Sequence, residues 1–105
     1  MTAFNVVRYK VKKGMEEKFL QDHRGFVFSM PGFRKGHVIK IGDQRYCFIG
    51  EWESAKASLD AEQPMVAMLN QFRDTLEDQG PGLGVTDFVV GDSLIEYYLL
   101  ERPCI

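Results

Sequence analysis

Hydrophobic and polar residues alternate along residues 2–12, which predicts a β-strand with one apolar face. Asn5, Val7 and Tyr9 share that face, and Asn5 interrupts it with an amide. Residues 15–30 follow helical spacing instead, and the predicted helix ends at Pro31-Gly32. Its apolar side is expected to carry Met15, Phe19, His23, Phe26, Val27 and Met30.

Two further strands are predicted over residues 33–41 and 45–53, joined by a hairpin turn at 42–44. Ser54 is a good N-cap for a second helix, in which Pro64 either introduces a kink or starts a second piece. An apolar stripe runs on to residue 79, formed by Met65, Met68, Leu69, Phe72 and Leu76. Residues 80–84 are irregular in composition, 85–92 are an extended linker or short strand, and 94–101 are the predicted final strand.

The order of these elements, β-α-β-β-α-β, predicts an α+β ferredoxin-like fold with an antiparallel sheet and one domain over residues 1–105. Two helices cover only one face of such a sheet, yet the third and fourth predicted strands are apolar on both faces. A large exposed apolar face is unusual in a monomer. We therefore expect a homodimer that forms through the sheets.

Composition and charge exclude several classes of protein. The chain has 105 residues, 45% of them hydrophobic, and a formal net charge of −2, so no basic surface indicates nucleic acid or a membrane as partner. Basic residues gather in the first half and acidic residues in the second, which predicts ion pairs between interleaved halves. Cys47 and Cys104 form no disulfide framework and no metal motif, so we expect a cytoplasmic protein without a metal.

Three local segments carry a resemblance to one family, namely Met30-Pro31-Gly32-Phe33, Gly50-Glu51-Trp52-Glu53-Ser54 and Gly82-Leu83-Gly84-Val85-Thr86-Asp87. The chain is similar to the antibiotic biosynthesis monooxygenase (ABM) domain family of the dimeric α/β-barrel superfamily over about residues 3–101. The resemblance implies a homodimer with sheets packed face to face and a pocket between sheet and helices in each subunit. Some relatives oxidise quinols or polyphenols with O₂ and neither metal nor flavin, and others degrade haem.

The resemblance makes Trp52 and Asn5 candidate catalytic residues. It implies that the Trp52 indole N–H holds a substrate oxygen; the alternative is a packing residue that anchors strand to helix. Asn5 is a second candidate donor, because a buried amide needs hydrogen bonds. The alternative for Asn5 is an amide that backbone groups satisfy.

The remaining candidates lie on the predicted helices. His23 is the candidate proton acceptor, or else a satisfied core histidine. Phe72 and Met68 would line an adaptable apolar site or belong to the core. Arg73 would turn toward a phenolate, or pair with Glu77 on the surface.

The function expected from this evidence is a cofactor-independent monooxygenase that oxidises a small electron-rich aromatic molecule, such as a quinol or an anthrone-type phenol. A second hypothesis is a non-catalytic homodimer that binds a small ligand or has a regulatory role. The third is haem degradation, for which the resemblance implies an iron-binding histidine on the second helix. Residues 54–79 contain no histidine.

Overall fold

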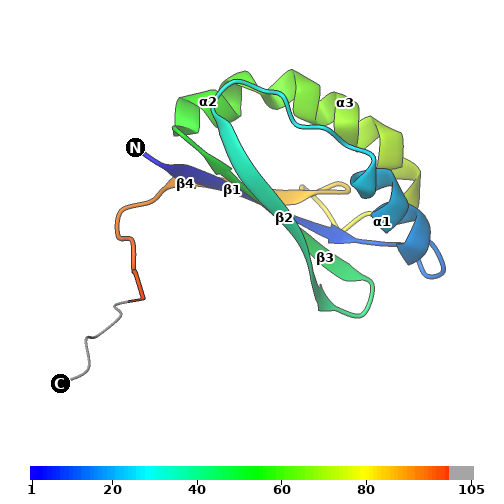
Figure 1. Cartoon of the computed structure of the whole chain (residues 1–105). Coiled ribbons are helices and arrows are strands. Elements are labelled where there is room, and N and C mark those ends of the chain that lie inside the picture. The colour runs from blue at the N-terminus through cyan, green and yellow to red at the C-terminus, as the bar shows by residue number, and fades with distance from the viewer. Residues whose placement is uncertain (100–105) are drawn as a thin grey trace.

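The computed structural model describes residues 1–99, and the described chain forms one sheet with helices on one of its faces (Figure 1). The sheet order is β2-β3-β1-β4, and every pair of neighbouring strands is antiparallel. This is the ferredoxin-like α+β fold that the sequence predicts. The elements are β1 (Ala3–Lys10), α1 (Glu16–Arg24), β2 (Phe33–Gly42), β3 (Arg45–Trp52), α2 (Ala55–Asp60), α3 (Glu62–Phe72), the 3₁₀ helix η1 (Arg73–Thr75) and β4 (Asp87–Asp92).

The helix predicted over residues 15–30 is too long, since α1 ends at Arg24. Gly25 follows it, and from there burial alternates: Phe26 and Phe28 are partly buried, whereas Val27 is exposed. Period-two burial is a property of extended chain. Aromatic and β-branched residues after a glycine favour that conformation over a helix. The segment 25–31 therefore crosses beside the sheet as an extended strap.

The second predicted helix is two helices. Ser54 caps α2, its Oγ accepting a hydrogen bond from the Ala57 backbone N–H at 3.1 Å. The chain breaks at Ala61, and Pro64 stands in the first turn of α3, where a missing N–H costs nothing. The helix stops at Phe72, well before residue 79, and η1 follows it.

The final strand was placed wrongly from sequence. β4 covers Asp87–Asp92, the segment predicted as a linker or short strand, and residues 93–99 leave the sheet without regular structure (Figure 1). The segment Asp87–Asp92 forms the strand because it pairs with β1: Phe88 and Val90 of β4 lie opposite Val7 and Asn5 of β1. Residues 100 and 101 of the predicted strand, and Cys104, lie outside the described residues.

The core lies between the sheet and the helices. The aromatic rings of its main cluster come from β1, α1, β3 and α3, namely Tyr9, Phe19, Tyr46, Phe48 and Phe72, and the larger Trp52 ring is fully buried beside Phe33. Ion pairs join the two halves of the chain as expected, for example Lys10 with Glu77 and Lys18 with Asp74. Within the described chain, every helix is too short or too polar to cross a lipid bilayer.

Candidate functional site

Asn5 and Trp52 form one buried unit, although 47 positions separate them in sequence. The indole Nε1–H of Trp52 donates a hydrogen bond to Asn5 Oδ1 at 2.7 Å. Trp52 is fully buried and its ring packs edge-on against Phe33, with ring centres 5.1 Å apart. Because an indole N–H can only donate, the amide atom facing it is oxygen, and the Asn5 nitrogen points the other way.

Gly50 makes this contact feasible. It lies directly opposite Asn5 in the register of β1 and β3. A Cβ at Gly50 would collide with Asn5 Oδ1 and would approach Trp52 Nε1 to 3.1 Å. The position therefore excludes any larger side chain while the Asn5–Trp52 pair is formed.

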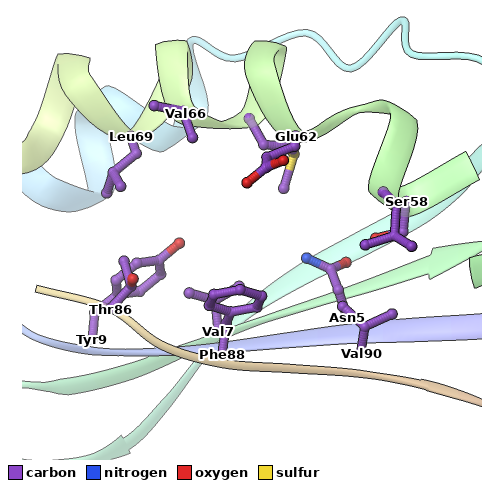
Figure 2. A pocket seen from close by; sticks show the side chains of 12 residues that line it. Asn5, Val7, Tyr9, Ser58, Glu62, Val66, Leu69, Thr86, Phe88 and Val90 are labelled. Carbon is purple, nitrogen blue, oxygen red and sulfur yellow. The ribbon is translucent and has the colours of Figure 1, made fainter. Parts of the chain in front are cut away.

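The freed amide nitrogen of Asn5 points into a pocket between the sheet and the helices (Figure 2). The pocket has a volume of about 210 Å³. Its floor is formed by Asn5, Val7, Tyr9, Thr86, Phe88 and Val90, and its roof by Ser58, Leu59, Glu62, Met65, Val66 and Leu69. Most of this lining is apolar, and a few polar groups converge on the space, as is typical of small-molecule sites.

Two of the polar groups face each other across the pocket. The Glu62 carboxylate points down from α3, and the Tyr9 hydroxyl points up from β1 (Figure 2). None of the ion pairs formed by residues 1–99 engages Glu62. Burial raises the pKa of the Tyr9 phenol above its usual range, so this hydroxyl stays a neutral donor. The site thus offers amide and phenol donors together with one carboxylate acceptor.

His23 lies elsewhere. It lines a separate cavity of about 240 Å³ on the β2 side of the molecule, together with Phe28 and Phe48. Its Nδ1–H donates to the Phe19 carbonyl at 2.8 Å, and the rings of Phe19 and Phe72 lie 4.3 Å and 4.2 Å from it. Burial lowers the pKa of the imidazole. The structure does not bring His23 together with Asn5.

The other sequence candidates also lie outside the pocket. Phe72 is a buried core residue, and Met68 lines a surface groove beside the 25–31 strap. Arg73 is exposed, and its Nε donates to Asn70 Oδ1 at 3.1 Å. The alternative predicted for Arg73, a surface pair with Glu77, is also wrong, because Glu77 pairs with Lys10 instead.

Sequence reasoning missed Glu62 and Tyr9. Tyr9 shares the predicted face of β1 with Asn5, so the strand alternation already places it beside the amide. Met65, Val66 and Leu69 follow Glu62 by three, four and seven residues, a spacing that puts them on the same face of a helix as Glu62. Extending that stripe backward from Met65 finds the carboxylate.

Comparison with known proteins gives no match by sequence. No protein-family model matches the chain, and no curated protein matches it.

Solved structures with the same fold do match. A protein from Chloroflexus aurantiacus J-10-fl, assigned to the antibiotic biosynthesis monooxygenases, has 10% identity and a TM-score of 0.69 over 93% of this chain and 98% of its own. A mutant of SnoaB, a cofactor-independent oxygenase from Streptomyces nogalater, has 16% identity and a TM-score of 0.64 over 90% and 95%. A mutant of MhuD with two manganese protoporphyrin IX molecules per active site has 17% identity and a TM-score of 0.68 over 91% and 98%.

Proposed function

We propose, from the fold that this chain shares with antibiotic biosynthesis monooxygenases, that it oxidises a small electron-rich aromatic molecule with O₂. The observation that carries the proposal is the Asn5 amide. Trp52 fixes its oxygen, and its N–H₂ group faces an apolar pocket sized for a small ligand. Such a donor suits a phenolate or enolate oxygen, whose charge an apolar site does not otherwise stabilise.

The chemistry needs a proton acceptor, and Glu62 fills that role in our proposal. For an anthrone-type substrate, Glu62 takes a proton from the acidic C–H, and Asn5 Nδ2–H holds the resulting oxyanion. The anion passes one electron to O₂, and the radical pair combines into a C–O bond. Glu62 returns its proton to the peroxide.

The peroxide then breaks down. Glu62 removes the second C–H proton as the O–O bond breaks, which forms the product carbonyl and hydroxide. The hydroxide takes that proton and leaves as water. One oxygen atom of O₂ enters the product and the other enters water, so the CH₂ group and O₂ balance the carbonyl and water without a further reductant.

Trp52 acts as a positioning residue in this scheme, because its N–H is already donated to Asn5. Tyr9 supplies a second neutral donor from the floor of the pocket.

A porphyrin is a poorer fit to the residues present. The described helices that roof the pocket offer Ser58, Glu62 and apolar side chains, and no imidazole faces it as an iron ligand.

The sheet supports the expected homodimer. Val6 and Val89 are register partners on the face away from the helices, and Ile39 lies on the same face. The tail over residues 93–99 is also apolar, with Leu94, Ile95, Tyr97, Tyr98 and Leu99 all strongly exposed. Burying this surface against a second copy is the simplest way to remove it from water. Self-association is part of the proposal.

Oxygen uptake with anthrone and with a naphthol, in the presence of a metal chelator, tests the function. Glu62→Gln should lose most of the turnover and keep substrate binding. Glu53→Gln, an exposed carboxylate outside the pocket, is the matched control and should keep full turnover. Saturable binding without oxygen uptake by the wild-type protein would overturn the enzymatic proposal in favour of a ligand-binding homodimer.

A further inference from the structure

A small, partly open cavity adjoins the candidate site and shares lining residues with it. It has a volume of about 30 Å³, and its eight lining side chains are apolar except for the Tyr9 phenol. The space is large enough for a diatomic molecule, and its lining favours an apolar one.

Shared side chains separate this cavity from the candidate site on one side and from the His23 cavity on the other. Tyr9, Met65 and Leu69 line both the small cavity and the candidate site. On the far side, the small cavity and the His23 cavity share three rings, those of Phe26, Phe28 and Phe48. The three spaces form a row through the subunit, from the β4 edge to the β2 edge.

The side chains between the spaces can move. Met65 and Met68 have flexible, unbranched side chains that adapt to irregular apolar gaps. Phe26 and Phe28 lie on the extended strap over residues 25–31, which is not held in a helix or strand.

We propose that this row of cavities is an apolar passage for O₂, with the small cavity as a binding site for the gas behind the substrate. The proposal rests on the proposed function, in which O₂ must reach a substrate that fills the pocket mouth. In this proposal an aromatic ligand between the sheet and α3 fills the pocket on the side of the exposed Phe88. O₂ then enters past Phe28, which lines both the small cavity and the His23 cavity.

Dissolved O₂ is itself the probe in the first experiment. Its paramagnetism increases the relaxation rate of methyl groups that it contacts. We expect the methyl-labelled wild-type protein under O₂ pressure to show a several-fold larger increase at Met65 and Met68 than at the exposed Met1. An increase at Met65 and Met68 no larger than at Met1 would overturn the passage.

A cavity-filling substitution gives the second readout. Phe28→Trp should reduce the O₂ effect at Met68, and should lower kcat/KM for O₂ while KM for the aromatic substrate is unchanged. Val27→Trp, on the neighbouring exposed residue, is the matched control. An undiminished O₂ effect in folded Phe28→Trp would contradict the route past Phe28. The relaxation measurement needs no turnover, so a protein that takes up O₂ at these methyls but oxidises nothing refutes the proposed function and leaves the gas site intact.

Discussion

The indole N–H of Trp52 donates to the side-chain oxygen of Asn5 at 2.7 Å, across strands β3 and β1. By donating to the amide oxygen, the Trp52 N–H fixes the orientation of the Asn5 side chain and therefore the direction of its N–H₂ group. Strand β1 alone would not orient this amide, because the orientation depends on a partner from β3 that binds the oxygen and not the nitrogen. The Asn5 nitrogen is thereby available to a ligand.

Removing the hydrogen-bond acceptor of Asn5 should lower the free energy of unfolding. Asn5→Ala leaves the buried Trp52 N–H without a partner, and we expect unfolding free energy to fall by about 1–3 kcal/mol. Trp52→Phe removes the donor as well. Urea denaturation of both single variants and the double variant should therefore give a coupling energy of about 0.5–3 kcal/mol. Strictly additive effects would contradict the pair.

Gly50 should tolerate no side chain. Gly50→Ala places a methyl group against Asn5 Oδ1, so we expect the Trp52 indole N–H resonance to shift and ligand binding to be lost. Gly91→Ala is a matched control, because a Cβ at this strand glycine meets no atom within 4 Å. A Gly50→Ala variant with unchanged Trp52 resonance and ligand affinity would show that the close approach is unimportant.

The order of the elements followed from strand alternation and helical spacing, whereas Asn5 and Trp52 became candidates through the family resemblance. The sequence could not show that Asn5 and Trp52 bind each other, since that depends on the β1–β3 register. The cavity that His23 faces could not be predicted for a related reason. An apolar stripe shows that a helix face is buried, but not which of two cavities it meets.

The end of the chain illustrates a second limit. Residues 94–101 are more β-rich than 87–92, yet the latter form β4 because they pair with β1. Local propensity cannot decide between adjacent strand-forming segments when tertiary pairing is available to only one. The Glu62 carboxylate was missed because it lies one turn before Met65, at the start of the helix that follows the break at Ala61.

His23 should make stability depend on pH. Burial lowers its pKa in the folded state, with backbone bonding to Phe19 and the Asp22 charge opposing this shift. The neutral ring is thus favoured by folding: its contribution is complete above about pH 6.5 and is lost as pH falls below that unfolded-state value. Chemical denaturation from pH 8 to 5 should show this loss in the wild type and a smaller one in His23→Phe. Equal pH slopes in the two proteins would contradict the assignment.

The uncovered face of the sheet should control assembly. Val89→Glu places a charge on this face, and we expect sedimentation equilibrium to show a shift from dimer toward monomer. Val27→Glu introduces the same charge at an exposed position on the strap and should leave the dimer intact. A wild-type protein that sediments as a monomer at all concentrations would contradict the proposed homodimer.

The central claim is that the pocket at Asn5 directs O₂ into an aromatic substrate. Mass spectrometry of the product formed under ¹⁸O₂ tests it most directly, with anthrone as substrate and a chelator present. The account predicts one ¹⁸O atom in the new carbonyl, formed rapidly by the wild-type protein and at the uncatalysed rate with Asn5→Ala. Carbonyl oxygen derived from water, or equal rates with the wild type and with no protein, would contradict it.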